Sequence, residues 1–493
     1  MPKVLDAVVI GAGLGGLAAA CRLAQEGLRV HVVERKEHPG GTAYSYARAG
    51  FTFPMGPLGV SSPDRIRRCL EGLGVRLSGP WRRVHYRVRA FGLDLPISRP
   101  SEELVEAFAA VSPTDRPALR RFFSEVRQAW RGDPVEDATR SASEHLAACI
   151  GDPRLRRVLG SLGTQAPYSS LSLLRSMWGL MVEEGIWHPP GGTRGLADRL
   201  VSRFGARGSD GCALRLSSPA RQVLVERGQV AGVQLEDGEV LRSARVICNT
   251  DYRVAVASLL PADALPSSWR AAVLGAKVTC SNIQVCLGVR AADVDLSAFA
   301  QASRLITRRE DAAQAPAKAP APQSYAKGEL ELSLLTAEDS SLAPPGGAVI
   351  VLRAEAKLED FQAFGPASDV RTEAYAGHKQ ALATELIAAA AEHLPGLERA
   401  IEALDVATPL TFRDAGGRTG GNVAGWSWDW EDRPEGAALD LIGTPIRGLY
   451  MAGVQALSAL FIGGVPTALQ SGALAAERAL ADAEPVSSTP LGP

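Results

Sequence analysis

Residues 4–34 read VLDAVVIGAGLGGLAAACRLAQEGLRVHVVE, and this stretch decides the fold. The apolar, β-branched run at 4–10 predicts a buried strand. A glycine-rich turn at 11–16 leads into a helix pattern that ends near Gly27, and a second strand pattern over 28–34 ends in an acid, Glu34. Strand, glycine turn, helix, strand and acid follow one another as in a βαβ unit that binds a dinucleotide.

Each glycine of the turn has a physical role in such a unit. Gly11 permits the tight turn, Gly13 lets the backbone approach a pyrophosphate, and Gly16 allows the helix to pack closely on the strand. The free N–H groups at the start of the helix favour phosphate. Glu34 lies 34 − 13 = 21 residues after the middle glycine, where an acid can bind ribose hydroxyls. The predicted cofactor site comprises Gly11, Gly13, Gly16 and Glu34, together with their neighbours Leu14, Gly15 and Arg35.

Composition excludes several classes of protein. The 493 residues suggest two or three domains, and 53 basic against 54 acidic residues give a net charge of −1, so we expect no nucleic-acid partner. Seven scattered cysteines include no C-x-x-C pair, which predicts free thiols in the cytoplasm and no metal site. The uncharged run 451–476 is long enough to span a bilayer, but its many polar residues and glycines argue against a membrane helix.

Further motifs follow in a fixed order. Gly40-Gly41-Thr42 comes soon after Glu34, and GFTF at 50–53 precedes Gly56-Pro57. VICNTD at 246–251 ends a strand pattern. DSSLAPPG at 339–346 precedes another strand, and Gly463-Gly464-Val465-Pro466 opens a helix of small residues. In this order the chain resembles the phytoene desaturase, carotenoid isomerase and retinol saturase group of FAD-dependent oxidoreductases, within the flavin amine-oxidase superfamily.

The resemblance implies a fold class and further cofactor contacts. The fold would be α/β, a Rossmann-like FAD-binding domain with a discontinuous α+β substrate domain of antiparallel sheet plus helices. Gly40, Gly41 and Thr42 would continue the nucleotide site, and Gly56 and Pro57 would approach the flavin ring. Val223 would contact the adenine through its backbone, and Asn249 and Asp251 match the family's N-A-D. The flavin end would be held by Gly453, Gln455, Gly464, Val465 and Pro466, with Gln455 where many relatives have an acid.

The resemblance also divides the chain. Residues 1–70, 190–257 and 436–484 would form the FAD-binding domain, and 71–189 and 258–435 the substrate and helical domain. Region 60–186 is arginine-rich and predicts mainly helices, whereas 213–247 predicts antiparallel hairpins with turns at Arg227-Gly228 and Asp237-Gly238. The Ala/Pro-rich stretch 311–323 predicts a flexible loop, and 485–493 a disordered tail.

Substrate contacts are harder to predict. A strand would place three tryptophans, Trp426, Trp428 and Trp430, on one face. These side chains would line an apolar tunnel, enter a membrane interface, or pack under the helical region. His188 is a candidate at the junction of substrate and flavin, with a solvated or capping role as the alternative. No catalytic acid–base pair is recognisable in the sequence.

Three functions compete. The first is FAD-dependent desaturation, isomerisation or saturation of C–C bonds in a hydrophobic, polyene-like substrate, with peripheral contact to a membrane. The second is oxidation of a C–N bond in a soluble amine, imine or carrier-bound intermediate. The third is non-enzymatic binding of a lipid or prenyl group, which the intact set Gly11, Gly13, Gly16 and Glu34 argues against. The sequence leaves the substrate, the electron acceptor and the oligomeric state open.

Overall fold

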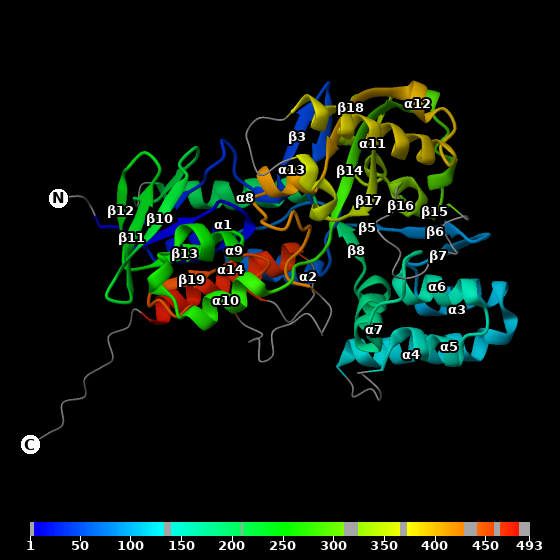
Figure 1. The fold of residues 1–493 in the computed structure, drawn as a ribbon, viewed down its shortest axis with the longest axis horizontal. Helices are drawn as coiled ribbons and strands as arrows, with labels where there is room; N and C mark the ends of the chain where they lie inside the picture. Colours follow the sequence, from blue (N-terminus) through cyan, green and yellow to red (C-terminus); the bar gives the residue numbers. More distant parts are fainter. Residues whose placement is uncertain are drawn as a thin grey trace, which may run out of the picture.

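The computed structural model describes residues 4–132, 140–208, 211–309, 324–364, 372–427, 441–457 and 464–482. The predicted loop 311–323, the tail 485–493, and Trp428 and Trp430 lie outside these described residues. Figure 1 shows a parallel sheet with its helices on one side of the molecule, and an antiparallel sheet and a helical group on the other.

Three separate stretches of the chain build the parallel sheet. Its strands lie in the order β19-β13-β1-β2-β9, and every neighbouring pair is parallel. The bounds are β1 (Ala7–Ile10), β2 (Val30–Val33), β9 (Ala213–Arg215), β13 (Val246–Cys248) and β19 (Leu449–Met451). The central strands β1 and β13 are buried throughout, as expected for a parallel sheet covered on both faces.

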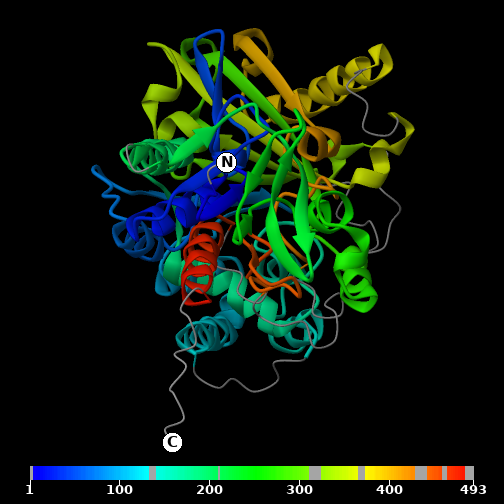
Figure 2. The ribbon, with the colours of Figure 1, turned by 90° about the vertical axis from the view of Figure 1, so that its left-hand side faces the viewer.

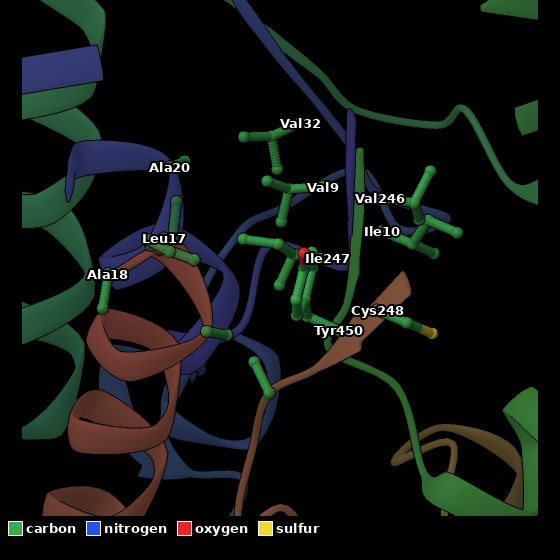
Figure 3. Close-up of a cluster of buried hydrophobic side chains, with 14 of the residues drawn as sticks. Val9, Ile10, Leu17, Ala18, Ala20, Val32, Val246, Ile247, Cys248 and Tyr450 are labelled. Atoms are coloured by element: carbon green, nitrogen blue, oxygen red, sulfur yellow. The ribbon is translucent and has the colours of Figure 1, made fainter. Parts of the chain in front are cut away.

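Four helices pack around this sheet: α1 (Leu14–Gln25), α2 (Pro63–Gly72), α8 (Gly192–Gly205) and α14 (Gly464–Ala481). Figure 3 shows Leu17 of α1 facing Val9 and Ile247 of the sheet. One expectation for 213–247 is wrong, because β9 joins the parallel sheet beside β2. The hairpins are confined to a three-stranded sheet of β10 (Ala220–Glu226), β11 (Gln229–Leu235) and β12 (Val240–Arg242).

The second sheet has seven strands in the order β18-β14-β17-β16-β15-β6-β7, antiparallel except between β15 and β6. Its strands are β6 (Tyr86–Ala90), β7 (Leu93–Pro96), β14 (Ser281–Arg290), β15 (Arg304–Arg308), β16 (Glu329–Leu334), β17 (Gly347–Ala356) and β18 (Ile401–Ala407). One face carries aliphatic side chains that form a core with α11 (Glu373–Ala391). The predicted fold class, a Rossmann-like domain with an antiparallel sheet and helices, is confirmed.

A group of helices follows the first strands of this sheet and lies below it in Figure 1. These helices are α3 (Ser101–Val111), α4 (Arg116–Arg131), α5 (Ala142–Cys149), α6 (Pro153–Ser161) and α7 (Leu171–Gly179). Their core centres on Trp178, which is fully buried among Phe108, Phe122 and Phe123. The expectation of mainly helices over 60–186 is wrong at 82–96. There, β5 (Arg82–Val84), β6 and β7 form, and arginines alternate with apolar residues in β6.

Shorter elements connect the layers. The hairpin of β3 (Ser45–Arg48) and β4 (Phe51–Pro54) rests on the seven-stranded sheet, and β8 (Ile186–His188) pairs with β5. The remaining helices are α9 (Tyr252–Val254), α10 (Ser267–Gly275), α12 (Leu397–Ala400) and α13 (Pro409–Asp414). Figure 2 views the molecule from the parallel-sheet side, with α14 in red.

Candidate functional site: a dinucleotide site beside a polar sheet face

The glycine turn lies at the carboxyl end of β1, where α1 begins. A Cβ atom at Gly16 would lie 2.0 Å from the Gly11 carbonyl oxygen, so the turn and the helix touch backbone to backbone. α1 begins after Gly13 with no side-chain cap and no acid in its first turn. Its first N–H groups are therefore left for an anion, as a pyrophosphate would require.

Asn249 supports this turn from behind. Its Nδ2 donates to the Gly11 carbonyl at 3.4 Å, and its Oδ1 lies where a Cβ at Gly15 would meet it at 2.6 Å. Its backbone N–H donates to the Ile10 carbonyl. Asn249 therefore braces the loop, and its contact with the cofactor stays a prediction.

Glu34 is buried at the end of β2 and points back to the turn. One carboxylate oxygen accepts the Ala12 N–H at 2.7 Å and the other accepts the Lys36 N–H at 3.0 Å. Two carboxylate oxygens offer about four acceptor positions, so capacity for two ribose hydroxyls is left. Arg35 is exposed and donates instead to the Asp414 and Ala415 carbonyls at the end of α13.

The second turn lies directly against the first. Gly13 and Gly40 form a parallel bridge, and a Cβ at Gly41 would lie 3.3 Å from the Gly13 Cα. Thr42, the next residue, is in turn in close contact with Gly56. A Cβ at Gly56 would lie 2.6 Å from the Thr42 carbonyl oxygen. Gly13, Gly41, Thr42 and Gly56 therefore mark a continuous line from the glycine turn towards the seven-stranded sheet.

The start of α1 packs against α14, backbone to backbone. A Cβ at Gly472 would lie 2.0 Å from the Gly15 carbonyl oxygen, and one at Gly15 would lie 2.9 Å from the Ala468 carbonyl oxygen. Gly464, Val465 and Pro466 lie in the first turn of α14, ahead of this contact along the chain.

The turn after β19 is fastened to α14. Ser471 Oγ accepts the Gly453 N–H at 2.9 Å and lies within hydrogen-bond distance of the Gly453 and Ala468 carbonyls. Gln455 accepts the Tyr252 N–H, and its buried Nε2 has no hydrogen-bond partner among the described residues. An unpartnered buried donor at this edge fits a cofactor oxygen. Asp251 caps α9 by accepting from the Arg253 and Val254 N–H groups.

Two further predicted residues, Val223 and Trp426, lie in or against the core of the parallel sheet, and their predicted contacts are untested. Val223 is fully buried in β10 and pairs with Val233 of β11. The indole N–H of Trp426 donates to the Gln455 carbonyl, and its ring lies 6.0 Å from that of Tyr252. Trp426 therefore packs against the core of the parallel sheet, and its predicted substrate contact is untested.

His188 lines a cavity of about 190 Å³ together with Pro57, Leu58 and Asp339. Its Nε2 lies 3.6 Å from an Asp339 carboxylate oxygen, and burial lowers the pKa of the imidazole. A neutral imidazole can accept a proton. Its place beside Pro57 keeps His188 as a candidate substrate contact.

Three side chains that the sequence analysis missed hold the loop 54–58, and two of them, Gln284 and Arg304, are buried. Gln284 Nε2 donates to the Pro54 carbonyl at 3.0 Å, Arg353 Nη2 donates to the Gly56 carbonyl, and Arg304 Nη2 donates to the Leu58 carbonyl at 3.1 Å. They come from β14, β17 and β15 and donate to alternate carbonyls of the loop, at positions 54, 56 and 58. The available signal was a polar or charged residue that interrupts each of three largely apolar strand patterns.

Two further findings concern absences among the described residues. In that part of the chain no group of three or more His, Cys, Asp and Glu side chains is placed to hold a metal ion. Nor does any described helix combine the length and apolar character needed to cross a membrane. All seven cysteines are free thiols.

Comparisons with known proteins agree with this geometry. The model of flavin containing amine oxidoreductases matches residues 14–277. Chloroplastic prolycopene isomerase of Daucus carota is 26% identical, in an alignment covering 97% of this chain and 80% of that protein. A neurosporene-forming phytoene desaturase of Cereibacter sphaeroides is 28% identical over 50% of this chain and 52% of that protein.

Solved structures with the same fold include an oxidoreductase from Methanosarcina mazei and a variant of putrescine oxidase. The first has a TM-score of 0.63 and 18% identity, covering 95% of this chain and 99% of that chain. The second has a TM-score of 0.65 and 16% identity, covering 97% and 100%.

Proposed function

Because the chain belongs to the family of flavin-containing amine oxidoreductases, we propose that it uses FAD to desaturate, isomerise or saturate C–C bonds of a hydrophobic, polyene-like substrate. Its cofactor is FAD and it is an oxidoreductase, as the sequence analysis predicted. The single observation that carries the choice of substrate is the likeness to prolycopene isomerase, which extends over 97% of this chain.

The residues of the line described above would hold the cofactor. The turn Gly11–Gly16 and the start of α1 would bind the pyrophosphate, and Glu34 the ribose hydroxyls. Gly41, Thr42, Gly56 and Pro57 would lie along the molecule towards its ring. The start of α14 and Gln455 Nε2 would face the flavin end. Bound FAD supplies the hydride or electron transfer, and the protein binds, orients and shields it.

Peripheral contact with a membrane belongs to the same proposal. A polyene partitions into lipid, so an enzyme that acts on it gains by docking at a bilayer surface. Co-sedimentation of the protein with lipid vesicles measures this contact.

The test of the function combines a spectrum with products. We expect the purified protein to show the visible absorption bands of oxidised flavin, before or after reconstitution with FAD. Anaerobic incubation with phytoene and with prolycopene should give a desaturated or isomerised product on chromatography. Peroxide release from soluble amines, with both polyenes unchanged, would support C–N oxidation instead. Failure to bind FAD at all would refute both enzymatic functions.

Glu34→Gln should weaken FAD binding about tenfold, because hydrogen bonds to a charged acceptor are worth roughly 1.5–3 kcal/mol. The amide keeps only one acceptor oxygen, so either the Ala12 N–H or the Lys36 N–H loses its partner. Fluorescence titration of the apoprotein with FAD measures the dissociation constant. The matched control is Glu37→Gln, an exposed neighbour, which should bind FAD as the wild type does. Equal affinities for all three proteins would remove Glu34 from the site.

A further inference from the structure

The face of the seven-stranded sheet opposite α11 carries polar side chains in register. Residues directly opposite on paired strands point to the same face. Gln284 of β14 is opposite Arg353 of β17, which is opposite Glu331 of β16. In the neighbouring row, Ser333 of β16 is opposite Arg304 of β15, which is opposite Tyr86 of β6.

The other face of the same strands is aliphatic. There Val285, Leu352, Leu332 and Leu305 follow one another across the sheet, and all four are buried. The strands therefore do not need the polar row for their own packing. In the first polar row, Gln284 and Arg353 donate hydrogen bonds to the Pro54 and Gly56 carbonyls. This row therefore lies at the end of the series Gly13, Gly41, Thr42 and Gly56 that is farthest from the glycine turn.

Arg353 and Glu331 are cross-strand neighbours of opposite charge that do not meet. Arg353 is drawn away, because its Nε and Nη2 donate to the Gln284 side-chain oxygen at 2.9 and 2.6 Å. No salt bridge or hydrogen bond joins these two described side chains. The one hydrogen bond to the Glu331 carboxylate comes from Ser333 Oγ at 2.8 Å. By contrast, Arg304 in the next row is paired with Glu338 at 3.0 Å.

The groups around this open pair have unused hydrogen-bonding capacity. Burial and the nearby Glu331 carboxylate raise the pKa of Tyr86, so its hydroxyl stays protonated and able to donate. No described residue forms a hydrogen bond with that hydroxyl, and Arg353, Glu331 and Tyr86 all keep some exposed surface. The Glu331 carboxylate can therefore accept, and the Arg353 guanidinium and the Tyr86 hydroxyl can donate, to a polar group that reaches them.

We infer that Glu331, Arg353 and Tyr86 bind a hydroxyl group of the substrate. A hydroxyl oxygen can accept from Arg353 or Tyr86 while its proton is donated to the Glu331 carboxylate, which neither a hydrocarbon nor an ether can do. This inference rests on the proposed function and narrows it: the polyene carries an alcohol group, and the three residues set specificity rather than perform the redox step.

The test compares three ligands of equal chain length: geranylgeraniol, its methyl ether, and the hydrocarbon without the oxygen. All three lack visible absorption, so perturbation of the flavin spectrum of the holoenzyme reports binding directly. We expect the wild type to bind the alcohol at least about tenfold more tightly than the ether or the hydrocarbon. Glu331→Gln should reduce that preference while FAD content and the flavin spectrum without ligand stay unchanged.

The matched control is Glu398→Gln, an exposed acid on α12, which should keep the full preference for the alcohol. Equal binding of alcohol, ether and hydrocarbon by the wild type would overturn the inference and leave the proposed function intact. Undiminished preference in Glu331→Gln would overturn it as well. If the wild type neither binds nor converts any polyene, the proposed function on which the inference rests would be refuted instead.

Discussion

Gly16→Ala is expected to yield a protein that is purified without flavin. The added Cβ would lie 2.0 Å from the Gly11 carbonyl oxygen and 3.2 Å from the Asn249 Cβ, where both neighbours are held by hydrogen bonds and packing. The clash is relieved only if α1 moves away from the turn, which takes the first N–H groups of the helix away from the pyrophosphate. Overpacking of this kind costs about 1–3 kcal/mol of stability, and we expect FAD affinity to fall at least about a hundredfold.

Two measurements separate lost binding from lost folding. Circular dichroism of the variant should show the wild-type content of helix and strand, while fluorescence titration reports the FAD dissociation constant. The control is Gly205→Ala at the exposed end of α8, where an added Cβ meets nothing within 4 Å. That variant should retain FAD and be no less stable than the wild type. Wild-type affinity in Gly16→Ala would show that the contact between turn and helix is not needed for the cofactor.

The nucleotide half of the molecule could be predicted because its signals are local. Gly11, Gly13, Gly16 and Glu34 lie within one βαβ unit, and their roles depend on backbone geometry that only certain residues permit. The start of α14 was also recognisable, since a run of small residues after a glycine pair is unusual. What the sequence could not show was that Gly15 and Gly472 bring α1 and α14 into backbone contact.

The substrate half was predicted poorly because its signals are non-local. The strands at 82–96 were not predicted, because their many arginines obscure the strand pattern. In the structure, Arg87 and Arg89 pair with Asp94 on the adjoining strand. Gln284, Arg353 and Arg304 come from three strands and meet only when the sheet forms. Conversely, the spacing of Trp426 from the next two tryptophans suggested a substrate contact, but Trp426 packs on Tyr252 beside the parallel sheet. Spacing along a strand predicts which residues share a face, and it does not predict what covers that face.

Arg304→Met should be the most destabilising of the substitutions considered. The Arg304 side chain is fully buried and that of Glu338 is 4% exposed, and the two are joined by a salt bridge of 3.0 Å. Removing one partner of a buried pair leaves an uncompensated charge, which costs about 3–5 kcal/mol. The Leu58 and Ser303 carbonyls also lose their donor. Urea denaturation of the FAD-loaded protein should therefore show a midpoint far below that of the wild type.

The double variant Arg304→Met/Glu338→Leu shows which part of this loss is electrostatic. Replacing both partners of a buried pair by apolar side chains is often neutral, so the double variant should regain most of the stability. It should not regain the hold on the loop 54–58, because no donor then reaches the Leu58 carbonyl, and its FAD affinity should stay below that of the wild type. For comparison, Arg290→Met breaks an exposed pair with Glu402 and should cost less than about 1 kcal/mol. If the double variant were as unstable as Arg304→Met, the anchoring of the loop, rather than the buried charge, would be what Arg304 contributes.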